Sequence, residues 1–238
     1  MKPQFFIPAA LTCISLALGG CPKQTTEAPS EPVKAPAPEE KAANAPTAAD
    51  APTAANAADQ KAPDKFAVRL ETTKGDIVID VTREWAPRGA DRFHELVQAG
   101  YLTDVAFFRV IKGFMAQVGI SGNPALNTEW REKKIPDDPP KQSNTVGMVS
   151  FATSGPNSRT TQFFINFGDN SRLDGMGFSP FGKVRDMAPV NALYAEYGEG
   201  APRGRGPSQG LIQSRGNEYL KREFPNLDYI KKATILAE

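Results

Sequence analysis

The chain has few of the side chains that enzymes commonly use for acid–base, nucleophilic or metal chemistry. Among its 238 residues it has one histidine, His94, and two cysteines, Cys13 and Cys21. Both cysteines lie near the N-terminus, so we expect no disulfide and no thiol site in the body of the protein. A single histidine removes most zinc sites and most histidine-based acid–base schemes. We therefore expect no metal and no cofactor.

The charges of the chain are nearly balanced, with a formal net charge of +1 at pH 7. A molecule without a strong field does not attract nucleic acid, so we expect no nucleic-acid partner. The sequence has no internal repeat and no glycine-rich phosphate loop, which argues against a repeat architecture and a nucleotide site. We expect a monomer.

The N-terminus has the pattern of an exported protein. Met-Lys is followed by an apolar run from Phe5 to Leu18, which is too short to span a bilayer comfortably. The Leu-Gly-Gly-Cys run that follows resembles the lipobox of bacterial lipoproteins. That resemblance implies a signal peptide over residues 1–20, cleavage before Cys21 and a lipid on its sulfur. The alternative is an ordinary signal peptide with incidental cysteines.

The residues after Cys21 indicate a membrane anchor followed by a spacer. Residue 22 is Pro rather than Asp, which by the same resemblance fits the periplasm-facing side of the outer membrane in a bacterial cell envelope. An anchor with two or more acyl chains holds stably to a membrane. In residues 21–64, Ala and Pro fill roughly half the positions and no aromatic occurs. Such a segment buries too little apolar surface to offset its ordering entropy, so a disordered linker is predicted.

Folded sequence is predicted from residue 65 to residue 238. Apolar residues alternate with polar ones on both sides of a turn at 72–76, which indicates a β-hairpin. Pro87 opens a helical pattern that Gly100 ends. His94 falls on the polar side of this pattern, so we interpret it as a solvated helix residue rather than a catalytic one.

Short β-type runs follow the helix, separated by Gly, Pro, Asn and Asp. A second helix is predicted at 213–223 and a last strand at 230–236, whereas 120–146 has little periodicity and is interpreted as a long ordered loop. Many short strands with two helices suggest a mainly β fold, a closed antiparallel barrel capped by helices. The β-type runs are 105–110, 114–118, 147–151, 162–166 and 181–184.

Two blocks combine an apolar wall with amide side chains, and neither contains a histidine, a cysteine or a carboxylate. In residues 107–119, Arg109 stands among phenylalanines and a methionine, with Gln117 close by. An unpaired charge on an apolar surface is expensive, so a fold keeps one there by pairing it or because a ligand uses it. Residues 147–166 likewise combine apolar residues with amide side chains. Any chemistry here works without a nucleophile, a metal or a general base.

Together these blocks resemble the cyclophilins, the peptidyl-prolyl cis-trans isomerases with an eight-stranded barrel. The resemblance covers about 65–238 and implies a closed eight-stranded antiparallel barrel capped by two helices. It also implies an enzyme that acts on proline-containing polypeptides and assists their folding. The strongest matching stretches are Phe-Phe-Arg-Val-Ile-Lys-Gly-Phe-Met-Ala-Gln at 107–117, Ala-Thr-Ser-Gly-Pro-Asn-Ser at 152–158, Gln-Phe-Phe-Ile at 162–165, Leu-Asp-Gly at 173–175 and Phe-Gly-Lys-Val at 181–184.

The resemblance assigns roles to individual residues. It implies catalysis by Arg109, with Gln117 positioning the substrate backbone and Phe114 lining the pocket for the proline ring. On the residues alone, the alternative is a surface Arg109 paired with a carboxylate such as Glu129, and apolar residues that belong to the barrel core. The residues implied to bind the substrate are Met115, Ala152, Thr153, Gln162, Phe164, Leu173 and Phe178.

The chain departs from the family pattern at the rim of this pocket. Arg172 stands where the family often has Trp, a residue linked to tight cyclosporin binding, so weak cyclosporin sensitivity is predicted. The run at 174–181 is one residue longer than usual, and Phe178 is interpreted as filling the aromatic wall. Thr153 replaces a common Asn and is expected to act through its backbone. The Gly/Pro/Arg loop at 198–210 is an insertion, interpreted as a flexible solvated loop or as a contact to a partner or an acidic surface.

The sequence thus predicts an exported isomerase that turns X–Pro bonds in envelope proteins. One alternative is a binding module, in which the same pocket holds a proline-bearing peptide without turnover. A peptide that binds while its isomerisation rate stays unchanged would favour that module. Another alternative is a purely structural envelope anchor, for which removal of the Arg109 side chain would have no consequence.

Overall fold

The computed structural model describes residues 61–237. The predictions for the signal peptide, for lipidation of Cys21 and for all but the last few residues of the linker fall outside the described residues. Ala62 is already buried, and its N–H donates to a carboxylate oxygen of Asp91 over 2.9 Å. The folded part of the chain therefore includes residues slightly before the predicted start at 65.

The domain begins with the predicted hairpin, formed by β1 (Lys65–Thr72) and β2 (Gly75–Thr82). The strands are antiparallel, and Val68 pairs with Ile79 near the centre of the register. Apolar side chains at alternate positions of both strands are buried, because successive residues of a strand point to opposite faces. Gly75 has a φ of +104°, which L side chains rarely adopt, so glycine suits the tight turn between the strands.

Helix α1 (Pro87–Gln98) packs on the sheet with the face that the helical pattern predicted. Its Phe93 is fully buried. The centroid of the Phe93 ring lies 5.3 Å from that of Phe163 and 5.0 Å from that of Phe181, both on the sheet. Aromatic contacts of this kind account for much of the apolar core beneath the helix.

His94 is not the solvated residue that the helical pattern predicted. It is 8% exposed, and its ring meets Phe66 of β1 edge-on at a centroid distance of 5.1 Å. Burial lowers the pKa of His94 below its ordinary value, because the charged form loses solvation. The prediction was wrong because periodicity identifies the face of a helix that meets the core but not a second element that covers its flank.

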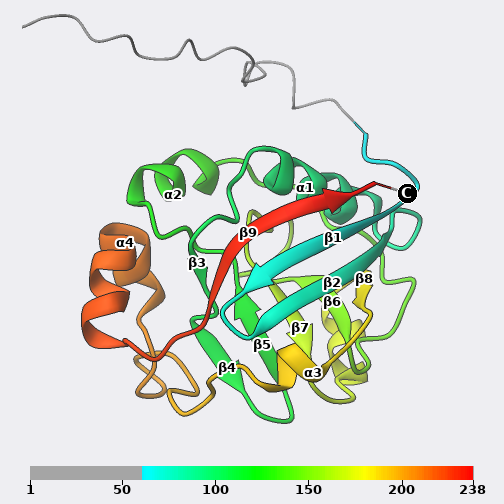
Figure 1. The fold of residues 1–238 in the computed structure, drawn as a ribbon. Helices are drawn as coiled ribbons and strands as arrows, with labels where there is room; N and C mark the ends of the chain where they lie inside the picture. Colours follow the sequence, from blue (N-terminus) through cyan, green and yellow to red (C-terminus); the bar gives the residue numbers. More distant parts are fainter. Residues whose placement is uncertain (1–60, 238) are drawn as a thin grey trace, which may run out of the picture. The chain divides into compact units, whose positions relative to one another are not determined.

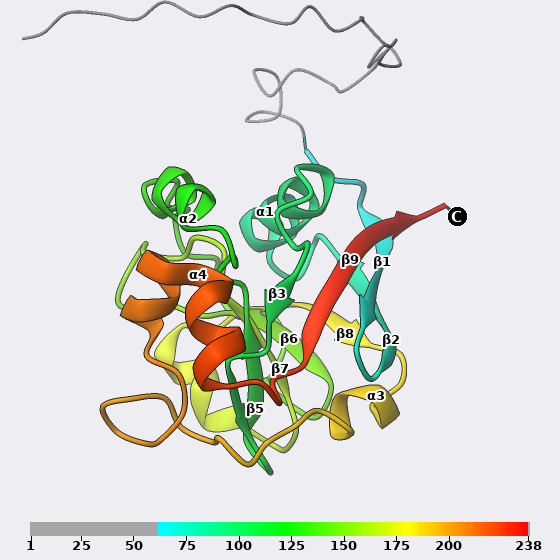
Figure 2. The ribbon, with the colours of Figure 1, turned by 60° about the vertical axis from the view of Figure 1, so that its left-hand side comes forward.

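The hairpin is extended into one curled antiparallel sheet, seen from two sides in Figures 1 and 2. The order of its strands is β3-β9-β1-β2-β8-β6-β7-β5-β4. All the predicted β-type runs form strands, although the run at 105–110 is divided between β3 and β4. The added strands are β3 (Val105–Ala106), β4 (Arg109–Ile111), β5 (Met115–Val118), β6 (Met148–Phe151), β7 (Phe163–Asn166), β8 (Pro180–Val184) and β9 (Tyr229–Leu236).

The sheet has nine strands, and the predicted closed barrel of eight strands is not confirmed. β3 and β4 lie at the two ends of the order, and within residues 61–237 no ladder joins them. β3 has 2 residues and β4 has 3, so neither offers a long edge for closure. The free edge of β4 is met instead by a single bridge between Val110 and Gly198.

Two further helices, α2 (Pro124–Arg131) and α4 (Gln209–Glu223), pack against each other beside the sheet (Figure 2). α2 lies within 120–146, so the prediction of a continuous loop there was wrong. Asn123 caps the helix with its side chain and Pro124 starts it. A helix of 8 residues is too short to show a clear apolar period.

The contact between α2 and α4 depends on glycine at position 216. Gly216 interrupts the helical conformation of α4 with a φ of 56°. The following N–H, that of Asn217, donates to the carbonyl of Gly122 over 2.9 Å. A Cβ at 216 would collide with that same carbonyl, so both the conformation and the space require glycine.

Two shorter helical segments complete the described part. They are the 3-10 helix η1 (Ser171–Met176) and helix α3 (Ala188–Asn191). None of the helices within 61–237 is both long enough and apolar enough to cross a membrane.

Candidate active site

A row of side chains across three strands forms the centre of the candidate site. Arg109 of β4 pairs in register with Gln117 of β5, and Gln117 pairs with Phe164 of β7. Residues directly opposite in an antiparallel ladder place their side chains on the same face, close enough to touch. The tight turn between β4 and β5 is made at Gly113, which has a φ of +75°. Strand register therefore brings a cation, an amide and an aromatic ring together.

The polar side of this row is a relay of amide hydrogen bonds. Nη1 of Arg109 donates to Oε1 of Gln117 over 3.0 Å. Nε2 of Gln117 donates in turn to Oε1 of Gln162 over 3.0 Å. Gln117 is 6% exposed, so both ends of its amide are satisfied within the protein and its orientation is held.

An apolar patch lies directly beside the arginine. Met115, Phe164 and Leu173 form its buried part. Phe178 packs against Phe164 edge-on at a centroid distance of 5.6 Å. The guanidinium carbon of Arg109 lies 5.7 Å from the ring centroid of Phe114, a cation–π distance. Arg109 thus stands at the border between an apolar surface and a polar one.

These side chains line a cavity of about 670 Å³, a size suited to a peptide segment or a small ligand. Every residue within 61–237 that the resemblance assigned to the site lines it. The sequence analysis did not assign the wall formed by residues 199–203 and 207, nor Arg131 and Lys134 at the rim. The predicted site residues that meet here are Arg109, Phe114, Met115, Gln117, Ala152, Thr153, Gln162, Phe164, Leu173 and Phe178.

The charge of Arg109 is paired within the protein, but not with the carboxylate considered from the sequence. Glu129 lies on α2 and pairs with Lys133 at 2.7 Å. The partner of Arg109 is Glu199, whose two carboxylate oxygens accept from Nε and Nη2, each over 2.7 Å. The hydrogen bonds from the guanidinium hold the pKa of Glu199 below its ordinary value. No local pattern pointed to this pair, because the residues are far apart in sequence and Glu199 lies in an irregular loop.

The loop that contains Thr153 also lines the cavity. The N–H of Ala152 donates to the carbonyl of Gln162 over 2.9 Å, which ties the start of the loop to β7. The hydroxyls of Thr153 and Ser158 lie 2.9 Å apart, and the N–H of Ser154 donates to the Ser158 hydroxyl over 2.9 Å. The loop is therefore closed on itself by short side chains, with its backbone beside the cavity.

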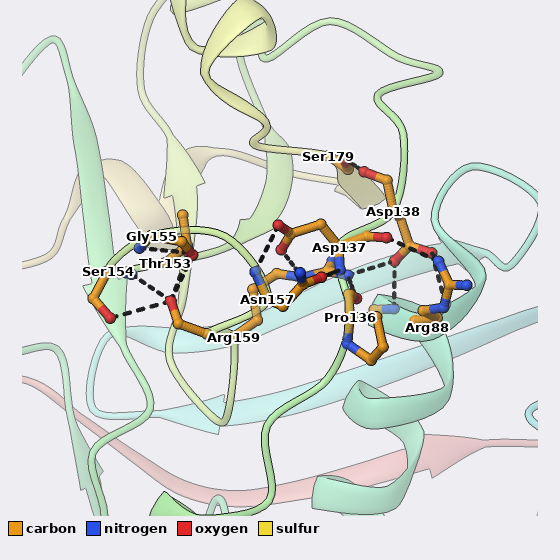
Figure 3. Close-up of polar contacts among 12 residues, drawn as sticks. Arg88, Pro136, Asp137, Asp138, Thr153, Ser154, Gly155, Asn157, Arg159 and Ser179 are labelled. Carbon is orange, nitrogen blue, oxygen red and sulfur yellow. Dashed lines mark hydrogen bonds and ion pairs between the residues drawn. The ribbon is translucent and has the colours of Figure 1, made fainter.

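Arg159 anchors this loop to the body of the domain (Figure 3). Its side chain is 2% exposed and forms ion pairs with Asp138 at 3.0 Å and with Asp137 at 3.3 Å. It also donates to the carbonyl of Pro136. The Asp138 carboxylate accepts as well from the N–H of Gly89 over 2.9 Å, at the first turn of α1. A buried charge network thus joins the cavity-lining loop to helix α1.

A second polar cluster holds Leu173 in the apolar patch. The carboxylate of its neighbour Asp174 accepts from the hydroxyl of Ser143 over 2.6 Å and from the side-chain amide of Asn144 over 2.7 Å. Burial acts to raise the pKa of Asp174, but these hydrogen bonds hold the pKa below its ordinary value. The carboxylate therefore remains charged and keeps η1 in place.

Within the described residues, no group of three or more His, Cys, Asp or Glu side chains is arranged to hold a metal ion. The cavity offers a guanidinium, amides, hydroxyls and an apolar patch. Such a set can bind a carbonyl group next to an apolar ring, and it can stabilise charge that develops there. The hydroxyls of Thr153 and Ser158 are hydrogen-bonded to each other and to the Gly155 carbonyl, and within residues 61–237 no histidine lines the cavity to activate them.

Comparison with known proteins agrees with this chemistry. The family model described as cyclophilin-type peptidyl-prolyl cis-trans isomerase matches residues 67–195. The isomerase cypE of Dictyostelium discoideum is 39% identical over 129 residues, which cover 52% of this chain and 80% of the relative. The human peptidyl-prolyl cis-trans isomerase-like 3 is 39% identical over 125 residues, covering 51% of this chain and 76% of the relative.

Solved structures show the same fold. A cyclophilin-type isomerase of Cryptosporidium parvum superposes with a TM-score of 0.54 at 23% identity, covering 73% of this chain and 99% of that protein. The same protein crystallised in the presence of the dipeptide Ala-Pro gives a TM-score of 0.53 at 22% identity, covering 72% of this chain and 99% of that protein. With the match of the family model over more than half of its length, the chain belongs to the cyclophilin-type peptidyl-prolyl cis-trans isomerases, enzymes that catalyse rotation about X–Pro peptide bonds.

Proposed function

We propose that Arg109 is the catalytic group of this isomerase and that the patch beside it holds the proline ring. The observation that carries the proposal is the row formed by Arg109, Gln117 and Phe164, in which a held guanidinium borders a buried apolar surface. A cavity with these side chains suits a reaction that needs a fixed cation and an apolar grip.

The chemistry of amide rotation explains why an arginine is sufficient. The barrier of about 18–20 kcal/mol comes from amide resonance, which is lost when the X–Pro bond twists. In the twisted state the prolyl nitrogen becomes pyramidal and regains a lone pair. An N–H of Arg109 aimed at that nitrogen finds its acceptor only after resonance is lost, so it binds the transition state better than the ground state.

The rest of the cavity has complementary tasks. Phe114, Met115 and Phe164 grip the proline ring while the other side of the bond turns. The same side chains exclude water, which strengthens the field of the guanidinium. Gln117 positions the substrate backbone through its place in the amide relay, and the backbone near Thr153 pairs with the peptide. Ala152, Gln162, Leu173 and Phe178 shape the adjoining groove.

The substrates that we propose are exported proteins of a bacterial cell envelope. The support is the N-terminal pattern, in which Leu-Gly-Gly-Cys at 18–21 resembles a lipobox and residues 21–64 have the composition of a spacer. A lipid at Cys21 would hold the isomerase at the membrane while the spacer gives it reach. The test is membrane fractionation of the full chain and of Cys21→Ala, where recovery of both in the same fraction would contradict the anchor.

The catalytic assignment is tested by isomerisation of an X–Pro peptide. Arg109→Ala is expected to lose about 100- to 1000-fold in kcat/KM, the usual effect of removing a hydrogen-bond donor that acts in a transition state. Arg185→Ala is the matched control, because Arg185 is exposed, pairs with Asp80 and does not line the cavity. Equal rates for Arg109→Ala and the control, with both variants folded, would refute the assignment of Arg109.

A further inference from the structure

The partner of Arg109 comes from a segment that is docked along the edge strand of the sheet. Val110 of β4 forms an antiparallel bridge with Gly198. In that register Arg109 lies opposite Glu199 and Lys112 lies opposite Glu196, and both couples form ion pairs, at 2.7 Å and 3.0 Å. The position of Glu199 is therefore set by backbone pairing as well as by charge.

The loop that follows Glu199 is built to hold it in place. The N–H of Gly206 donates to the Glu199 carbonyl over 2.8 Å, and the N–H of Gly200 donates to Oε1 of its carboxylate over 2.9 Å. A Cβ at Gly204 would collide with the Glu199 carbonyl, so the loop can close this tightly only with glycine there. The insertion at 198–210 is thus hydrogen-bonded to itself and forms a wall of the cavity.

The hydrogen bonds of Arg109 leave one defined N–H donor free. A guanidinium carries five N–H donors in one plane. Glu199 takes one from Nε and one from Nη2, and Gln117 takes one from Nη1. Nη1 also donates to Sδ of Met115 over 3.8 Å, so one N–H of Nη2 remains for a ligand. Because the guanidinium is planar, holding it at these points also fixes the direction of this donor.

We infer that Glu199 is a positioning residue for the isomerase reaction, holding Arg109 so that its remaining N–H on Nη2 faces the X–Pro bond. The inference rests on the proposed role of Arg109. The side chains of Arg109 and Glu199 are 22% and 36% exposed, and ion pairs with such access to water add little to stability. Their two-point geometry has its main consequence in the direction of the guanidinium.

The Glu199 carboxylate also offsets part of the positive charge of Arg109, and this effect by itself acts against catalysis. Rotation of an amide creates no net charge, however, and shifts only partial charge onto the prolyl nitrogen. The reaction therefore depends more on the direction of the N–H donor than on the net charge of the site. When Glu199 is neutralised, we expect the lost orientation of the Arg109 guanidinium to lower the rate more than its less compensated positive charge raises it.

The experiment compares E199Q with E196Q in the full chain, using kcat and KM for an X–Pro peptide. Both variants remove one negative charge from the same docked segment, but only E199Q removes the two-point contact with Arg109. We expect kcat of E199Q to fall about tenfold with little change in KM, because small misplacements of a catalytic group act on the transition state. E196Q should retain the wild-type kcat.

Two further variants separate positioning from a general structural effect. E199D keeps the charge but shortens the side chain, so its kcat should lie between those of wild type and E199Q. In an R109A background, E199Q should have no further effect on the residual rate. An E199Q kcat equal to or above that of E196Q, or a further loss in the R109A background, would overturn the inference. A normal rate for R109A alone would instead refute the proposed role of Arg109.

Discussion

Replacement of Arg159 by methionine tests whether the buried charge network stabilises the domain. Methionine fills much of the same volume but removes the cation that Asp138 and Asp137 share, which leaves Asp138 only the more distant guanidinium of Arg88 at 3.9 Å. Removing one partner of a buried ion pair typically costs about 3–5 kcal/mol of unfolding free energy. Asp138 keeps the backbone N–H groups of Arg88 and Gly89 as donors, which places the expected cost near the lower end, about 3 kcal/mol.

This cost converts into a change of melting temperature that is easy to measure. For a domain of this size, each kcal/mol lowers Tm by about 2–4 °C, so Arg159→Met is expected to lower Tm by about 6–12 °C. The assay is thermal unfolding of the full chain followed by circular dichroism. KM for an X–Pro peptide is expected to rise as well, because Arg159 anchors the loop that contains Thr153.

Arg185→Met is the matched control for this prediction. Its ion pair with Asp80 is shorter, at 2.7 Å, but the two side chains are 54% and 52% exposed. Water screens such a pair, so the control is expected to have the same Tm as the wild type. If Arg159→Met and Arg185→Met lower Tm equally, or if neither lowers it, the reasoning from burial is wrong.

Three other predictions concern separate parts of the domain. Because burial lowers the pKa of His94, the unfolded state binds its proton more readily. The free energy of unfolding is therefore expected to fall as pH drops below about 6.5. His94→Phe keeps a ring against Phe66 but cannot bind a proton, so urea titrations at several pH values should show a weaker pH dependence for this variant. Gly216→Ala should lower Tm clearly by colliding with the carbonyl of Gly122. Gly210→Ala should not, because its added Cβ would only make an ordinary van der Waals contact with the Ser208 hydroxyl at 3.9 Å. Arg172→Trp should tighten cyclosporin binding measured by calorimetry; unchanged binding would contradict the predicted role of that position.

The parts of the structure that could be predicted from sequence are those with short-range patterns. The alternation of apolar and polar residues at 65–82 predicted the hairpin, and the helical period of apolar residues at 87–100 predicted α1. The resemblance of the motifs to a known family predicted the residues that meet in the cavity. Glu199 could not be predicted, because its position depends on a bridge between an irregular loop and the edge strand. The environment of His94 was missed for a similar reason, since Phe66 approaches it from a different element.

Local sequence patterns could also not predict the number of strands or whether the sheet closes into a barrel. The run at 105–110 reads as one strand, but the chain bends between β3 and β4 and sends them to opposite ends of the sheet. For α2, the sequence contains only a helix-start signal, Asn123-Pro124, and the residues that follow have no clear period of apolar side chains. In each of these cases tertiary contacts decide the outcome.

The relay from Arg109 through Gln117 to Gln162 has a direction, and that direction bears on why proline suits this cavity. Each link donates from the arginine side toward Gln162, so the amide oxygen of each glutamine already accepts one hydrogen bond. What these side chains leave for a ligand is N–H groups, from Arg109 and from the amide nitrogen of Gln162. A residue whose backbone N–H had to be buried against such a surface would meet mainly other donors. Proline has no backbone N–H, so it can present its nitrogen to this surface without leaving a donor unpaired.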